Sequence, residues 1–184
     1  MAARWGEFVT RLDISATKEP ASVTASGERL QKLIDGVAVR RTAIQEYEHG
    51  ITSEIFSDAW NIDSAPVRHI SQSMVRAGHV KGWVYHKLTV DRLTAICGSF
   101  KFVLWDIRPQ SPTHGMVNEI FLSERNRGLL SIPTYVVHAV QNIGDTDATF
   151  VNLPTLPYNH ADPDKYRIDD PALVPYRFDK GMAW

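Results

Sequence analysis

The sequence has little cysteine and no long hydrophobic run. Cys97 is the single cysteine among 184 residues, so no disulfide can form within the chain, and this usage favours a reducing compartment. We expect Cys97 to be a small apolar residue in a strand rather than a nucleophile, because nothing beside it in the sequence would lower the pKa of its thiol. No apolar run approaches the roughly 18 residues that a membrane span needs.

An excess of charge of one sign is also lacking. The formal net charge is −1, from 20 Lys and Arg against 21 Asp and Glu. This balance argues against a nucleic-acid-binding or membrane-surface protein, although it allows a local basic pocket for a small anion. The N-terminal stretch MAARWGEFVTRLD is charged and has no apolar segment. We therefore expect no signal peptide and a cytoplasmic location.

A series of short β-rich runs begins at residue 67. Turn signals rich in Gly, Pro, Asn and Asp separate the runs, a pattern typical of an all-β sandwich or barrel. No helical pattern alternates with them, which argues against a parallel α/β sheet. The runs lie at residues 67–75, 81–88, 92–97, 100–107, 117–122, 128–132, 136–143 and 148–153.

Residues 1–35 are predicted to form an N-terminal arm with one short helix. In the stretch GERLQKLIDGV, Leu30, Leu33 and Ile34 have the i, i+3, i+4 spacing of a helix face. Gly36 follows in the position of a helix stop.

Extended and irregular segments are expected on either side of the β-rich runs. Residues 37–44 and 51–60 read as two extended segments around the turn-like stretch EYEHG. Residues 157–184 are rich in proline and charge, and we expect a tail that wraps the barrel with one turn of helix.

Two strands carry histidine among apolar residues. Strand alternation places Val84 and His86 on one face of the first strand, with Trp83 and Tyr85 on the other. His138 lies in the second strand. Because inward positions of a small barrel converge on one cavity, these two histidines are predicted to face each other.

The spacing of these residues resembles the paired motifs of the cupin superfamily. Asp91, six residues and Gly98 match the first motif, and Pro133, His138 and Asn142 match the second, with Tyr135 in the usual glycine place. More narrowly, the chain is similar to the nucleotide-sugar (dTDP-4-dehydrorhamnose) 3,5-epimerase family. That similarity lies in DIRPQSPTHG (106–115), LSERNRGLLSIPTYVVHAVQN (122–142) and DDPAL (169–173).

This resemblance implies a fold and an assembly. The fold is an all-β, cupin-type double-stranded β-helix, a jelly-roll barrel with N- and C-terminal arms. The barrel domain would span residues 36–178, followed by a C-terminal tail at 179–184. The family also implies a homodimer that exchanges N-terminal segments.

The chain departs from the family pattern at the catalytic base. The family motif Arg-Gly-Leu-His reads Lys81-Gly82-Trp83-Val84 here, so valine stands where the catalytic histidine is expected. The family's buried aspartate partner has no clear equivalent. The chain is therefore predicted to be a divergent member that lacks the usual base.

His86 and His138 are the predicted catalytic residues. An imidazole has a pKa near neutral pH, which suits a base that removes a proton next to a ketone, and we assign this role to His86. His138 matches a family histidine that lines the pocket. The alternative for each is a structural histidine bonded to the backbone.

The resemblance also implies a substrate and the residues that bind it. The substrate would be a dTDP-4-keto-6-deoxyhexose type of nucleotide sugar, with no cofactor. Lys81 and Arg92 are predicted to contact phosphate, Tyr158 to stack on the base or sugar, and His49 to stand for a family arginine.

Two alternatives of other classes stay open. The departures from the motif fit a catalytically degenerate cupin that only binds a sugar nucleotide. His86, Asp91 and His138 could instead hold a divalent metal in a metal-dependent isomerase or oxygenase. The resembled epimerases need no metal, so our first expectation is a site without one.

Overall fold

The computed structural model describes residues 16–27, 29–63 and 65–178. The chain divides into two compact units, residues 1–32 and 33–184. Among the described residues of the first unit, an isolated bridge joins Val23 and Arg29. In the described part of the chain, no helix has the length and apolar character needed to cross a membrane.

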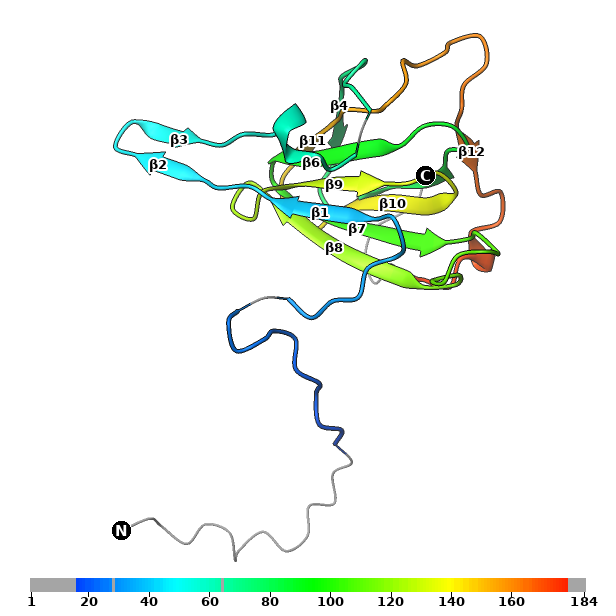
Figure 1. Ribbon diagram of the computed structural model, residues 1–184, viewed down its shortest axis with the longest axis horizontal. Coiled ribbons are helices and arrows are strands. Elements are labelled where there is room, and N and C mark those ends of the chain that lie inside the picture. Colours follow the sequence, from blue (N-terminus) through cyan, green and yellow to red (C-terminus); the bar gives the residue numbers. More distant parts are fainter. Residues whose placement is uncertain (1–15, 28, 64, 179–184) are drawn as a thin grey trace, which may run out of the picture. The chain divides into compact units, whose positions relative to one another are not determined.

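Antiparallel β-strands are the main secondary structure in the described part of the second unit (Figure 1). The strands of the barrel begin with β1 (Ala38–Arg41) and continue with β4 (Ser71–Val75), β5 (Val80–Tyr85), β6 (Asp91–Cys97), β7 (Ser99–Asp106), β8 (Val117–Ser123), β9 (Gly128–Ile132), β10 (Val136–Asn142), β11 (Ala148–Asn152) and β12 (Tyr166–Arg167). A separate hairpin consists of β2 (Gln45–Tyr47) and β3 (Gly50–Thr52).

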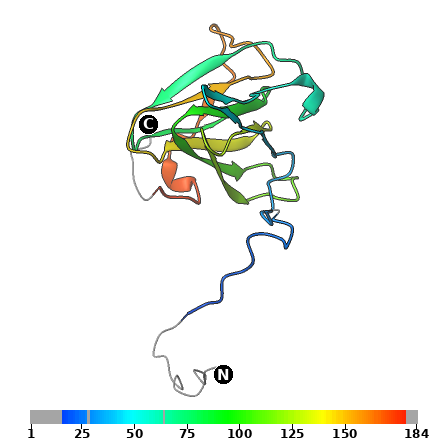
Figure 2. The same ribbon diagram turned by 90° about the vertical axis from the view of Figure 1, so that its left-hand side faces the viewer.

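The barrel strands form two five-stranded sheets, which Figure 2 shows turned by 90° from Figure 1. One sheet has the order β1-β9-β6-β11-β4, and the other has the order β12-β5-β10-β7-β8. The apolar core draws side chains from both sheets, so the sheets face each other around it. This architecture confirms the predicted all-β, cupin-type jelly roll.

The side chains of β7 alternate between a face that points into the core and a face that points outward. Phe100, Phe102 and Leu104 are fully buried in the core between the sheets, whereas Val103 joins a second cluster on the outer face. The rings of Phe100 and Phe102 meet Phe150 edge-on, at centroid distances of 5.6 and 6.1 Å. Burying each such side chain contributes about 1.5–3 kcal/mol.

The C-terminal segment covers the outer face of the second sheet. Val174 is buried there with Trp83, whose ring lies 6.1 Å from that of Tyr176 and 5.3 Å from that of Phe178. Because of this cover, every residue of β10 is buried. The segment also contains η2 (Pro171–Leu173), the predicted turn of helix in the tail.

The prediction of a short helix before the barrel is wrong. Within the described residues 29–36, the chain forms a bridge and a turn rather than a helix. Nucleating a single turn is costly in isolation, and distant partners hold this backbone instead. The amide of Ile34 donates to Asn118 Oδ1 at 2.8 Å, and that of Asp35 donates to Thr113 Oγ1 at 2.9 Å.

One further expectation needs correction. The segment predicted to be extended over residues 51–60 contains only β3 and then η1 (Asp58–Trp60), a 3-10 helix capped by the side chain of Ser57. Cys97 ends β6, in a strand as expected, and its side chain is exposed.

Candidate active site

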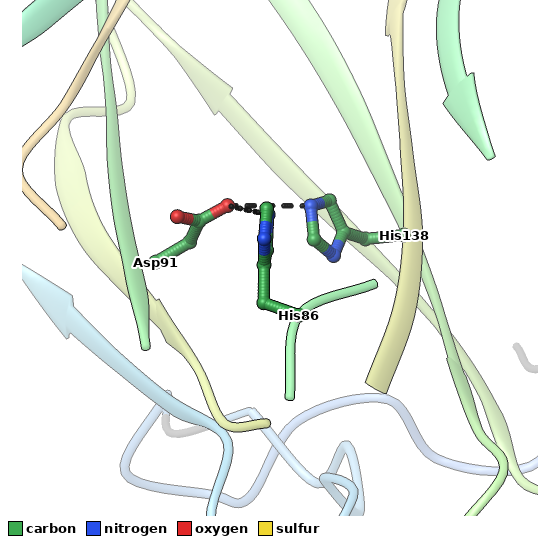
Figure 3. A group of neighbouring side chains, drawn as sticks. All are labelled: His86, Asp91 and His138. Carbon is green, nitrogen blue, oxygen red and sulfur yellow. Dashed lines mark ion pairs between the residues drawn. The ribbon is translucent and has the colours of Figure 1, made fainter. Parts of the chain in front are cut away.

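Three neighbouring elements bring His86, Asp91 and His138 together inside the barrel (Figure 3). His86 directly follows β5, Asp91 begins β6, and His138 lies within β10. The register of β10 against β5 places His138 opposite Val84. The two predicted catalytic histidines therefore face each other, with ring centroids 5.6 Å apart.

One carboxylate oxygen joins both histidines. Asp91 Oδ2 lies 3.2 Å from His86 Nε2 and 3.3 Å from His138 Nε2, as the two dashed lines in Figure 3 show. The other oxygen, Oδ1, accepts a hydrogen bond from Asn152 Nδ2 at 2.9 Å. Asp91 is buried, and both of its oxygens are occupied by these neighbours.

The second ring nitrogen of each histidine faces a backbone carbonyl. His86 Nδ1 contacts the carbonyl of Asp164, and His138 Nδ1 lies 3.1 Å from the carbonyl of Val136. A carbonyl oxygen only accepts, so each Nδ1 carries a hydrogen. Nε2 is consequently the nitrogen that gains or loses a proton.

The cluster favours a charged His86 and an ionised Asp91. Although burial opposes ionisation, hydrogen bonds from His138 and His86 hold the pKa of Asp91 well below its usual range. Burial likewise opposes the charged form of His86, but the hydrogen bond and negative charge of Asp91 outweigh it and raise the pKa of His86.

Two cavities meet at the cluster. The first, of about 200 Å³, is lined by both histidines, Asp91, Val84 and Tyr158 among others. The second, of about 370 Å³, shares His86, Asp91 and Tyr158 with it. A ligand that spans both cavities would therefore pass His86.

The first cavity is lined by cations. Lys81, Lys165 and Arg167 all border it, and among the described residues of its lining Asp91 is the one acid. Lys81 Nζ donates to Ser73 Oγ at 2.7 Å. Partial burial and then the nearby charges of Lys165 and Arg167 lower the pKa of Lys81. The cavity is therefore suited to an anionic ligand.

A family model for dTDP-4-dehydrorhamnose 3,5-epimerase matches residues 31–176. The chain belongs to this family. The resemblance drawn from its motifs is thereby confirmed, and the protein is a nucleotide-sugar epimerase-like cupin.

Individual relatives support the same assignment. The spore coat polysaccharide biosynthesis protein SpsL of Bacillus subtilis (strain 168) is 31% identical over 146 residues, which is 77% of this chain and 94% of the relative. A dTDP sugar isomerase from Desulfovibrio desulfuricans G20 is 25% identical, with a TM-score of 0.72 over 78% of this chain and 91% of its own.

A further solved structure shares the fold. The Legionella pneumophila epimerase RmlC, solved in complex with dTDP-4-keto-L-rhamnose, has a TM-score of 0.70 and 21% identity, and the match covers 83% of this chain and 85% of its own.

The prediction for Arg92 is wrong. Its side chain is fully buried and donates to the carbonyls of Leu153, Ala65 and Pro66 at 2.8–3.1 Å. It also pairs with Asp63 at 3.4 Å. Side chains alternate along β6, so the residue after the cavity-facing Asp91 points away from the cavity. Arg92 stabilises a loop and is not part of the lining of either cavity.

The other predicted binding residues lie in different places. Lys81 and Tyr158 line the first cavity, where the sequence predicted them to act. His49 lies in the turn between β2 and β3, stacked on Tyr47 at 5.5 Å, and the lining of the two cavities does not include it. The structure thus does not bring His49 to the cluster.

Sequence reasoning missed the contribution of the C-terminal segment. Asp164, Lys165 and Arg167 border the cavities, yet their stretch reads as a charged, proline-rich tail. The spacing of Lys165 and Arg167 could have indicated this contribution, because side chains two residues apart lie on the same face of a strand.

Proposed function

We propose that the protein removes a proton next to the ketone of a nucleotide-linked 4-keto-6-deoxyhexose, with His86 as the base. The observation that carries this proposal is the cluster of His86, Asp91 and His138, buried where two cavities meet. Membership of the epimerase family supports the reaction class.

The arrangement of His86 suits a base. In its neutral form it holds a hydrogen on Nδ1 against the carbonyl of Asp164, which leaves Nε2 to accept the substrate proton. The carbon–hydrogen bond breaks, the proton passes to Nε2, and the electron pair moves into an enolate. Asp91, 3.2 Å from Nε2, stabilises the imidazolium that forms.

His138 is proposed to polarise the pocket. Its Nε2 contacts the same oxygen of Asp91, so its ring lies beside the charges of the cluster while the enolate forms. A proton from solvent that reaches the opposite face of the carbon inverts its configuration and completes an epimerisation, and the His86 imidazolium then releases its proton to solvent. Return of a proton to the same face leaves the sugar unchanged apart from exchange with solvent.

The cations of the first cavity are proposed to bind the diphosphate of the nucleotide sugar. Lys81, Lys165 and Arg167 offer several donors to phosphate oxygens, and charge-assisted hydrogen bonds of this kind are among the stronger ones. The dTDP-sugar bound by the Legionella relative supports a ligand of the same class.

Tyr158 is proposed to stack on the sugar or base. It lines both cavities and its side chain is half exposed, so its ring is accessible to a ligand.

The homodimer and the cytoplasmic location, which follow from the family resemblance and from the composition, remain predictions.

Proton NMR in D2O tests the reaction. The protein is incubated with dTDP-4-keto-6-deoxyglucose, and deuterium is followed at C3 and C5 of the sugar. We expect exchange at one or both carbons. A protein that binds the compound saturably but exchanges neither carbon would be the degenerate binding cupin instead.

A metal-dependent cupin is the second candidate. The ligand atoms of His86, Asp91 and His138 all lie within 4.8 Å of one another, and each Nδ1 is held by a carbonyl in the manner of a metal-binding histidine. Elemental analysis of the purified protein decides between the candidates. Stoichiometric zinc, iron, manganese or nickel would support the second, and a metal-free, active protein would eliminate it.

A further inference from the structure

Asp164 in the C-terminal segment holds the loop that carries His86. Its Oδ1 accepts the backbone amide of Lys87 at 2.9 Å, and its Oδ2 accepts those of Leu88 and Thr89, each at 2.9 Å. Three amides directed at one carboxylate are charge-assisted hydrogen bonds, roughly twice as strong as neutral ones. The side chain therefore fixes the loop directly after His86.

The main chain of the same residue holds the His86 ring. The carbonyl of Asp164 accepts from His86 Nδ1. One residue thus contacts both the loop and the imidazole, although it lies 78 positions along the chain from His86.

The strand that follows Asp164 anchors it to β5. In β12, Tyr166 pairs with Tyr85 and Arg167 pairs with Val84. The rings of Tyr166 and Tyr85 stack at 5.2 Å, and Arg167 Nη1 donates to the carbonyl of Gly82 at 2.8 Å. These contacts keep the Asp164 carbonyl in place beside β5.

We propose that Asp164 is the positioning residue for His86 and selects the tautomer with hydrogen on Nδ1, so that Nε2 is left to exchange protons. This role rests on the proposed function of His86 as the base. It gives the C-terminal segment a part in the reaction, since the segment supplies the group that orients a base located in the barrel.

Two variants and one control test the proposal. Asp164→Ala removes the three amide contacts, and Asp164→Asn keeps the shape of the side chain without its charge. Asp169→Ala is the control, because this exposed aspartate lies in the same segment outside the cavity linings. All are compared with the full wild-type chain by thermal unfolding, to establish that each is folded.

The first readout is the tautomer of neutral His86, measured from its ring 15N shifts by NMR at a pH above its pKa and without any substrate. We expect Nδ1–H in the wild type and in Asp169→Ala, a mixture of tautomers in Asp164→Ala, and an intermediate result in Asp164→Asn. An unchanged tautomer in a folded Asp164→Ala would overturn the proposal, whether or not the protein has the proposed activity.

The second readout is the rate of deuterium exchange at the sugar. Misplacement of a catalytic group by about 1 Å can cost roughly 100-fold in rate, so we expect kcat to fall about 10- to 100-fold in Asp164→Ala with KM little changed. A raised KM with unchanged kcat would instead make Asp164 a substrate contact and overturn the positioning role. Wild-type protein without exchange, but with the expected tautomer, would refute the proposed function alone.

Discussion

Asp91 is the residue that links the two histidines, because both Nε2 atoms contact its Oδ2. Burial works against the charged form of His86, yet the hydrogen bond and charge of Asp91 raise the pKa of His86 overall. The pKa of His86 therefore depends strongly on this carboxylate.

Asp91→Asn is expected to lower the pKa of His86. The amide keeps the shape of the side chain but removes the negative charge that favours the imidazolium, while burial continues to oppose it. An NMR titration of the histidine ring measures the change, with wild-type protein as the reference. A pKa that stays constant or rises in the variant would contradict the electrostatic account of the cluster.

Lys81→Met is expected to weaken binding of a nucleotide diphosphate. Methionine keeps most of the aliphatic length but removes the charge that lines the first cavity. A charge-assisted contact contributes about 1.5–3 kcal/mol, so the Kd for dTDP, measured by calorimetry, should rise by about tenfold or more. The exposed Lys18→Met provides the control. Equal affinities of wild type and Lys81→Met for dTDP would show that the diphosphate binds elsewhere.

At the scale of the strand, Gly82 permits β5 and β10 to lie close together. A Cβ atom built on Gly82 would lie 2.4 Å from Ala139 Cβ and 2.6 Å from Ala139 Cα. Both distances are far below van der Waals contact, and the Cα atom belongs to the backbone, which cannot move away as a flexible side chain can. The glycine therefore fixes the distance between the strands that carry Val84 and His138.

Gly82→Ala is expected to destabilise the fold. Overpacking of a closely packed site costs about 1–3 kcal/mol, and separation of β5 from β10 would also displace His86 relative to His138. Chemical denaturation measures the stability, and the ring contact between the histidines can be followed by NMR. A variant as stable as wild type would show that the two strands tolerate more separation than the packing implies.

The elements differ in how well the sequence predicted them. Strands such as β7 were predictable because alternating residues face either the core or the outer cluster. The helix before the barrel was not, because Ile34 and Asp35 bond to residues about 80 positions away. Arg92 was misplaced for a related reason, since its burial depends on carbonyls from two distant loops.

The candidate site was predicted in part. That His86 and His138 face each other follows from the alternation of inward positions along the strands and from the resemblance to a known barrel. As a site residue, Asp91 was identified only as a possible metal ligand. Lys81 was predicted as well, whereas Lys165, Arg167 and the carbonyl of Asp164 were not, because their position depends on where a segment without a strong pattern crosses β5.

At the scale of the whole molecule, the buried carboxylate of Asp106 holds two separate segments of the chain together. Asp106 is fully buried and accepts hydrogen bonds from Ser111 Oγ at 2.6 Å and Thr113 Oγ1 at 2.7 Å. It also pairs with Arg108 at 2.8 Å, and Arg108 donates to the carbonyl of Asp35. The network ties the chain entering the barrel to the turn after β7.

Acid is expected to destabilise the protein through this network. Although burial opposes ionisation, the bonds from Arg108, Ser111 and Thr113 hold the pKa of Asp106 well below its usual value. Because the folded pKa is depressed, the stabilisation is complete above the unfolded value of about 3.9. It is lost as the pH falls from there toward the folded pKa.

Asp106→Asn tests this pH dependence. Breaking a buried ion pair costs about 3–5 kcal/mol, so the variant should be less stable at pH 7. Its unfolding free energy should also change less than that of the wild type between pH 5 and about pH 3. Denaturant titrations at several pH values provide the comparison. Parallel pH profiles for the two proteins would contradict the assignment.

Deuterium incorporation into dTDP-4-keto-6-deoxyglucose by wild type, His86→Gln and His114→Gln tests directly whether His86 is the base. His114 is exposed in the turn after β7 and serves as the matched control. We expect exchange next to the ketone for wild type and His114→Gln, and a loss of at least about 100-fold for a folded His86→Gln. Exchange at the wild-type rate in His86→Gln would show that another group removes the proton.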